Sequence, residues 1–284
     1  LLSTAFSGYE KNDSEGSKQF QQLRVEENIR KRSESAAAMR DSEKEYLDSL
    51  NIAMHKFYEP IQKSTETQYP ILSPADINSI FCTLPQIHKA HTNFFKNLDK
   101  RVNTWDNNTT IGDLYLELVI DIMKAYSMFF DNYPTAMETL ETTMGNSIHF
   151  ATFIVTNEKE LKITLTSLLE KPLKRLAVYY LNLEEIQQYT LDSHPDLPHL
   201  KTVITRLREY LDQQKQNKLE TIKAGGPLLR TRTNSVSKIT RKGSWTSGQM
   251  ASVKSNLVAN GTITPKSPEK GSPNTIRSNG KFNS

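Results

Sequence analysis

Apolar residues after Pro172 recur at intervals of three and four, at Leu173, Leu176, Tyr179, Tyr180, Leu183 and Ile186. This spacing places them along one face of an α-helix, whereas a half-buried strand would alternate apolar and polar residues. Pro172 fits the first turn of such a helix, because a backbone nitrogen there has no partner within the helix. The segment therefore predicts an amphipathic helix with one buried face.

The same period recurs through most of the chain, and no segment alternates in the manner of a strand. Pro60 and Pro134 are expected to end helices, Pro85 is expected to bend one, and Ser73 has the position of a helix cap. The fold predicted is all-α, an elongated multi-helix bundle. Its helices are expected at about residues 17–63, 74–98, 109–133, 135–154, 157–170, 172–191 and 196–219.

Composition divides the chain into three parts. Residues 1–17 are rich in Gly, Ser, Asp and Asn and predict a flexible leader, and residues 18–222 form the helical domain. Residues 223–284 contain mainly Ser, Thr, Asn, Gly, Pro and Lys, so they bury too little apolar surface to offset the entropy of ordering. We predict a disordered, Ser/Thr/Lys-rich tail.

Charge follows the same division. The whole chain carries +4, and eleven Lys and Arg with one Glu give the part from Lys223 onward +10, so residues 1–222 carry −6. An acidic body therefore has a basic tail. The tail spreads its charges and holds few aromatic residues, which argues against nucleic acid as a partner and permits weak contact with anionic lipid.

No feature of the sequence predicts a metal site or a cofactor. His88 and His91 are three residues apart but have no further ligand at a suitable spacing, and no phosphate-binding glycine loop is present. The lone Cys82 excludes an intrachain disulfide and is expected to be a buried thiol in a reducing compartment. No apolar run reaches the roughly 18 residues needed to span a bilayer. The expected location is cytoplasmic, with recruitment to a membrane as a further hypothesis.

Three segments in order resemble the conserved regions of the Dbl-homology domain, the helical module of Rho-family guanine nucleotide exchange factors. The first contains Ser42-Glu43, Tyr46 and Leu50, followed by Phe57-Tyr58-Glu59-Pro60-Ile61. The second runs from Ile80-Phe81 to Leu98, and the third is Leu168 to Ile186. Order and spacing agree over about residues 30–220.

The resemblance implies an exchange factor that performs no covalent chemistry. Members of this family bind a Rho, Rac or Cdc42-type GTPase, remodel its two switch loops and stabilise the nucleotide-free state, so that GDP leaves. No catalytic group, metal or cofactor on the exchange factor is needed. The resemblance implies a GTPase-binding face made of Ala38, Asp41, Ser42, Glu45, Lys174, Ala177, Val178, Lys215 and, with a shifted alignment, Asp212.

Other motif residues are expected to be structural. We expect Arg175 to pair with an acid such as Glu43 across the bundle, and Tyr46 and Tyr179 to lie in the core with their hydroxyls at its edge. Leu50 and Pro172 complete this structural set.

Several contact positions differ from the family pattern. Ala38 stands where a carboxylate is usual, Lys174 and Val178 where a Gln and a Lys are usual, and Lys215 where an Asn is common. Two hypotheses stay open, a divergent exchange factor and a helical scaffold of the same fold without exchange activity. A membrane-shaping helical dimer is a third class, against which the body's −6 argues.

The tail contains candidate phosphorylation sites. Ser235 follows two arginines and Ser244 follows an Arg-Lys pair, as basic-directed kinases prefer. Thr264, Ser267 and Ser272 each precede a proline. Each phosphate adds about −1.5 to −2 charge, so two or three would remove a third or more of the tail's +10. Kinases are thus predicted partners of the tail.

Overall fold

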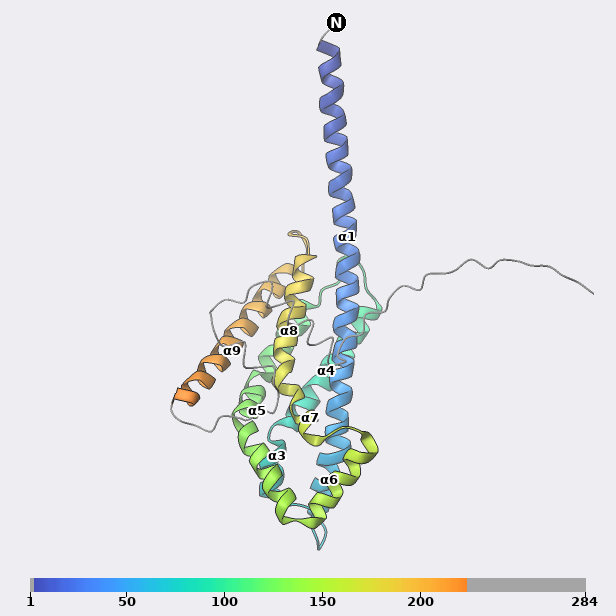
Figure 1. The fold of residues 1–284 in the computed structure, drawn as a ribbon. Coiled ribbons are helices and arrows are strands. Elements are labelled where there is room, and N and C mark those ends of the chain that lie inside the picture. Colours follow the sequence, from blue (N-terminus) through green and yellow to red (C-terminus); the bar gives the residue numbers. More distant parts are fainter. Residues whose placement is uncertain (1–2, 224–284) are drawn as a thin grey trace, which may run out of the picture. The chain divides into compact units, whose positions relative to one another are not determined.

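The computed structural model describes residues 3–223, and every regular element among them is a helix (Figure 1). The elements are α1 (Ser3–Ile52), a π-helix η1 (Ala53–Tyr58), α2 (Glu59–Ser64), α3 (Pro74–Phe81), α4 (Leu84–Asn103), α5 (Gly112–Asn146), α6 (Ile148–Leu161), α7 (Leu165–Leu169), α8 (Lys171–Gln188) and α9 (Leu197–Lys223). The all-α prediction is confirmed. The predicted disordered tail, with its five candidate phosphorylation sites, lies outside the described residues.

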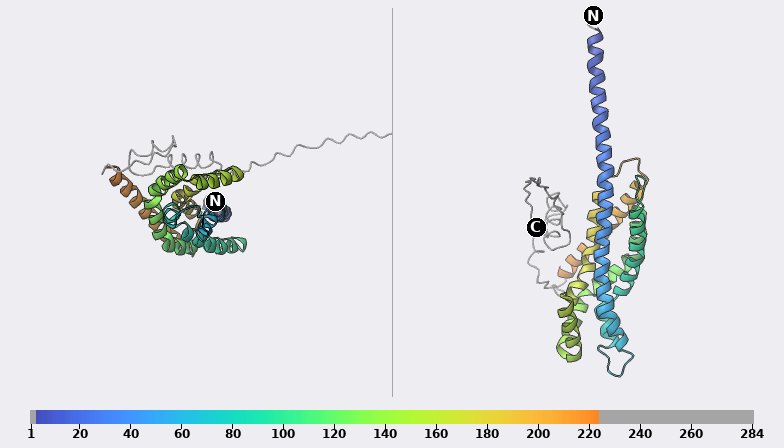
Figure 2. Two further views of the ribbon diagram at one scale, coloured as in Figure 1. Left: turned by 90° about the horizontal axis from the view of Figure 1, so that it is seen from below. Right: turned by 90° about the vertical axis from the view of Figure 1, so that its right-hand side faces the viewer.

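The long helices lie side by side around one core, as expected for an elongated bundle (Figures 1 and 2). α1 packs against α4 and α8, α4 and α9 both pack against α5, and α8 packs against α9. Each of these helices contributes fully buried apolar side chains, among them Leu50, Leu98, Tyr115, Leu183 and Leu207. One contiguous core therefore fixes the relative positions of helices that are far apart in the sequence.

The prediction of a flexible leader over residues 1–17 is wrong for the residues described. α1 begins at Ser3 and continues without a break to Ile52. No proline occurs before residue 52, and the two glycines in this stretch cost helix stability by only about 1 kcal/mol each, so nothing ends the helix. The N-terminal part of α1 extends beyond the other helices (Figures 1 and 2), and residues 16–26 are exposed.

Two predicted proline effects are also wrong. The helix expected over residues 74–98 is two helices, because Cys82 adopts a positive φ of 45° after α3, and Pro85 lies in the first turn of α4. Cys82 is half-buried at this break, with Sγ 3.8 Å from the carbonyl oxygen of Met128, and is not a buried helix residue. Pro134 lies inside α5, which continues to Asn146 because Ala136 and Leu140 keep its apolar face buried.

Candidate functional site

A cluster of buried polar groups lies where α1 meets α8. The Glu43 carboxylate accepts hydrogen bonds from Arg175 (Nη2 to Oε2, 2.5 Å) and from the Tyr179 hydroxyl (2.5 Å to Oε2), and its Oε1 lies 2.7 Å from His91 Nδ1. All four side chains are buried. The Glu43–Arg175 pair is the one expected from the sequence. Burial alone raises the pKa of the Glu43 carboxyl, but Arg175 and His91 offset this, so the pKa lies below its ordinary value.

The cluster continues into α4 and α5. His91 Nε2 lies 3.0 Å from the Tyr126 hydroxyl, which lies 2.8 Å from the hydroxyl of Tyr46. The expectation that Tyr46 and Tyr179 place their hydroxyls at the edge of the core is therefore wrong. Both tyrosines are buried, and their hydroxyls bond partners that are also buried, Tyr126 for Tyr46 and Glu43 for Tyr179. We call Glu43, Tyr46, His91, Tyr126, Arg175 and Tyr179 the Glu43 cluster.

Arg175 connects this cluster to the surface. Its Nη1 donates to the Ser42 hydroxyl at 2.9 Å, and its guanidinium lies over the rings of Tyr46 and Tyr179, 4.8 and 4.6 Å from their centroids. Ser42 is half-buried. Ser42, which the resemblance assigned to the GTPase-binding face, therefore also orders Arg175 from outside.

The remaining residues of the predicted face occupy the surfaces of three helices. On α1, Ala38, Asp41 and Glu45 are exposed. On α8, Lys174 is exposed and Ala177 and Val178 are half-buried. On α9, Asp212 and Lys215 are exposed. Asp41 accepts from the neighbouring Arg40 at 2.7 Å, and Lys174 Nζ lies 3.5 Å from Glu170. These surface pairs are weak, so both charges stay available to a partner.

Contacts between α8 and α9 place the predicted residues of these two helices at similar levels along the bundle. α8 and α9 run in opposite directions (Figure 1), and Arg208 of α9 bonds Tyr180 and Glu184 of α8, with Nη2 3.0 Å from the Tyr180 hydroxyl. Lys215 lies about 10 Å further along α9, and Val178 and Lys174 about 3 and 9 Å back along α8, at 1.5 Å per residue. The structural residues Leu50 and Pro172 are buried, Pro172 in the first turn of α8.

A second polar cluster, which the sequence did not reveal, lies where α9 begins. The Arg32 guanidinium on α1 donates to Asp196 Oδ2 at 2.7 Å, to the Thr109 carbonyl at 2.8 Å and to the Thr190 hydroxyl at 3.2 Å. Asp196 has a helix-capping residue type, but its carboxylate caps α5, 84 residues earlier in the chain, with Gly112 N donating to Oδ1 at 2.8 Å. Sequence spacing gives no signal for such a distant cap.

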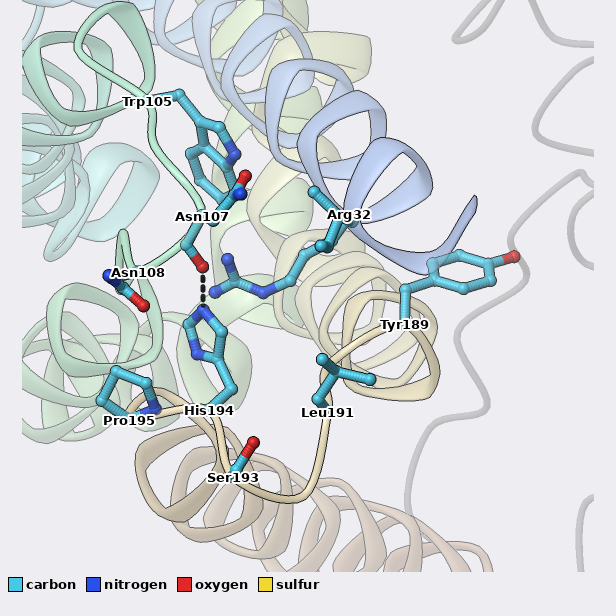
Figure 3. Close-up of a pocket in the computed structure, with 10 residues that line it drawn as sticks. Arg32, Trp105, Asn107, Asn108, Tyr189, Leu191, Ser193, His194 and Pro195 are labelled. Carbon is cyan, nitrogen blue, oxygen red and sulfur yellow. Dashed lines mark hydrogen bonds between the residues drawn. The ribbon is translucent and has the colours of Figure 1, made fainter. Parts of the chain in front are cut away.

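This cluster borders a cavity of about 170 Å³ between α1, the α4–α5 loop and the α8–α9 loop (Figure 3). His194 spans the two loops, since its Nε2 donates to the Asn107 carbonyl at 2.8 Å and its Nδ1 accepts from Asp196 N at 3.1 Å. Burial and the nearby Arg32 charge lower the pKa of His194. We call Arg32, Thr109, Thr190, His194 and Asp196 the α9 joint.

His88 and His91 have separate partners. His88 Nε2 lies 2.7 Å from Asn51 Oδ1, and His91 belongs to the Glu43 cluster. Within residues 16–220, whose side chains the structure describes except at Lys218, no group of three His, Cys, Asp or Glu side chains is placed to hold a metal ion. None of the described helices is long and apolar enough to cross a membrane.

Comparison with known proteins places this geometry in a family. The family model described as the RhoGEF domain matches residues 36–215, which includes α8, the Glu43 cluster and most of α9. The chain belongs to the RhoGEF, or Dbl-homology, family. The matched region ends at Lys215, the last residue of the predicted GTPase-binding face.

Curated relatives and solved structures agree with this assignment. Protein ECT2 of Homo sapiens is 27% identical over 189 residues (66% of this chain and 21% of that protein), and Rho guanine nucleotide exchange factor 10 of Homo sapiens is 28% identical over 185 residues (63% and 13%). The chain thus spans about a fifth or less of these relatives. A crystal structure of human RhoA with the DH/PH fragment of PDZ-RhoGEF matches with a TM-score of 0.60 at 19% identity, over 66% of this chain and 54% of that one, and so supports the fold.

Proposed function

We propose that this RhoGEF domain accelerates GDP release from a Rho, Rac or Cdc42-type GTPase. The match of the RhoGEF family over residues 36–215 is the observation that carries the proposal. A rigid base of buried ion pairs beneath an exposed polar face on α1, α8 and α9 supports it. A structural neighbour of the domain, the DH/PH fragment of PDZ-RhoGEF, was crystallised with RhoA.

The proposed mechanism is differential binding. Nucleotide exchange makes and breaks no covalent bond and needs no nucleophile on the exchange factor, so acceleration has to come from binding the nucleotide-free GTPase more tightly than the loaded one. Asp41 and Glu45 of α1 and Lys174 and Lys215 of α8 and α9 supply exposed charges of both signs for the switch regions. Ser42 and Arg175 hold the α1–α8 part of this face in one geometry.

A scaffold without exchange activity is the second candidate. It is favoured by Ala38 and Val178, which stand where the family pattern has polar residues and whose side chains cannot form a hydrogen bond or an ion pair with a GTPase. Such a protein would bind a GTPase without a preference for its empty state, and would leave the rate of GDP release unchanged.

Release of a fluorescent GDP analogue from a panel of purified Rho-family GTPases distinguishes the two. We expect the full chain to accelerate release from one or a few members. Lys174→Glu with Val178→Asp should reduce the acceleration at least tenfold, because it places acidic groups in the α8 part of the face. Glu138→Gln on the exposed side of α5 is the control and should retain the rate.

If the folded chain binds a GTPase but accelerates GDP release from no member of the panel, the scaffold is favoured. Loss of helicity in the double variant would mean that these residues belong to the core. We further propose that the basic tail contacts anionic lipid weakly and is phosphorylated by kinases.

A further inference from the structure

We infer that the α9 joint sets the direction of α9 and thereby positions Asp212 and Lys215 in the binding face. The inference rests on the proposed function for its effect on exchange, but the geometry of the joint is independent of it. Asp196 of the joint immediately precedes α9, and the two face residues lie in the C-terminal half of that helix.

One carboxylate ties the start of α9 to two other helices. Asp196 Oδ2 accepts from Arg32 Nη2 at 2.7 Å and from Ile111 N at 3.0 Å, while Oδ1 accepts from Gly112 N at 2.8 Å. Asp196 is fully buried, and its own carbonyl accepts from Leu200 N at 3.0 Å, which starts α9. The first turn of α9 is therefore held to α1 and to the first turn of α5.

Arg32 and His194 tie the loops at this point. Arg32 is 3% exposed, reaches Thr190 at the end of α8 and the Thr109 carbonyl before α5, and lies 4.9 Å from the Trp105 ring centroid. In Figure 3 the guanidinium points between Trp105 and His194, and the dashed line joins His194 to Asn107. Since a carbonyl only accepts and an N–H only donates, His194 is held as the neutral tautomer with its proton on Nε2.

The length of α9 makes its direction sensitive to the joint. Tyr210 is the last buried residue of α9 whose side chain is described, and Asp212 and Lys215 lie beyond it. They are about 24 and 28 Å from Asp196 along the helix, at 1.5 Å per residue. A tilt of about 10° at the joint would therefore displace Lys215 by about 5 Å, more than the tolerance of a hydrogen bond.

A buried ion pair is a reasonable device for this purpose. Such pairs contribute little net stability compared with apolar residues, but their directional bonds select one arrangement. Apolar side chains such as Leu200, Val203 and Leu207 hold α9 against the bundle. Apolar contacts tolerate small rotations of the helix better than hydrogen bonds of 2.7–3.0 Å do. The hydrogen bonds of the α9 joint therefore fix the direction of α9.

The test measures the distance between spin labels on α1 and α9 in the full chain. Labels are attached to Lys44→Cys and Gln216→Cys, both exposed positions outside the predicted face, in a Cys82→Ser background. Arg32→Met removes the joint's cation. Arg32→Met with Asp196→Asn also removes the carboxylate charge left behind, and serves if the single variant does not fold. Arg30→Met, an exposed arginine two residues away, is the control.

We expect both joint variants to keep their helicity, to broaden or shift the distance distribution by about 5 Å, and to lower GDP release at least tenfold for a GTPase that responds to the parent chain. Arg30→Met should match the parent in both measurements. A folded joint variant with the parent's distance distribution would overturn the inference, as would a shifted distribution with unchanged exchange. If the parent chain accelerates GDP release from no GTPase, the proposed function fails, and the distance measurement still decides whether the joint directs α9.

Discussion

Gly112 lies where the start of α9 approaches the first turn of α5 too closely for a side chain. A Cβ added there would lie 2.8 Å from Asp196 Oδ1, 2.8 Å from Leu200 N and 3.0 Å from His199 Cβ. Two of these neighbours are backbone or the held carboxylate of the α9 joint, so they have little freedom to move. The glycine is therefore required by the close approach of the α9 start to the first turn of α5.

Gly112→Ala should lower the free energy of unfolding by about 1–3 kcal/mol, because overpacking forces the helix starts apart. Gly145→Ala in the same helix is the matched control. Its added Cβ meets nothing within 4 Å, so it should raise stability by up to about 1 kcal/mol. Urea unfolding followed by circular dichroism measures both. Equal stability of the two variants would contradict the close approach.

Local hydrogen bonds and backbone conformation determine where several helices begin and end. Ser73, Ser147 and Thr164 each accept a hydrogen bond from the backbone N–H three residues later, at 3.1, 3.2 and 3.1 Å. At the end of α6, Lys162 adopts a left-handed conformation with φ 54° and ψ 30°. That conformation favours glycine, so the lysine there carries conformational strain.

Lys162→Gly should therefore raise the free energy of unfolding by about 0.5–1 kcal/mol. Lys159→Gly, three residues earlier in the same helix, should lower it by about 1 kcal/mol, because there the glycine only adds entropy to the unfolded chain. Opposite signs in thermal or urea unfolding are the expected result. A loss of stability in both variants would show that the C-cap conformation is not strained.

The Glu43 cluster joins four helices, α1, α4, α5 and α8, through side chains that are all buried. Removing one member leaves a charge or a polar group without a partner in the interior. Such a substitution therefore lowers the stability of the whole bundle. The same cluster also makes the bundle sensitive to acid, because the pKa of Glu43 is lower in the folded than in the unfolded chain.

Glu43→Ala should lower the free energy of unfolding by about 3–5 kcal/mol near neutral pH, since it strands the Arg175 charge. In the parent, the stability from Glu43 is fully present above the unfolded carboxyl pKa of about 4.5 and is lost as the pH falls below it. Urea midpoints between pH 7 and 3.5 should thus fall more steeply for the parent than for Glu43→Ala. Glu34→Ala, an exposed pair member on the same helix, should follow the parent. Parallel pH profiles for the parent and Glu43→Ala would contradict the lowered pKa.

Patterns local in sequence predicted much of this protein. Apolar spacing of three and four predicted the helices, since each helix must bury one face. The place of Arg175 and Glu43 within the family-like motifs predicted their ion pair across the bundle. Prolines were less reliable. Pro134 is carried inside α5 because tertiary burial of the neighbouring apolar residues outweighs one lost hydrogen bond.

By itself the sequence determined the fold class, the buried faces and the family resemblance, because these depend on residue type and on short, regular intervals. Only the tertiary structure decided that Asp196 caps a helix 84 residues away, that Arg32 is buried beside it, and that the hydroxyls of Tyr46 and Tyr179 are internal. Those contacts join residues whose separation in the chain carries no period. They exist only once the packed helices bring the partners within hydrogen-bond distance.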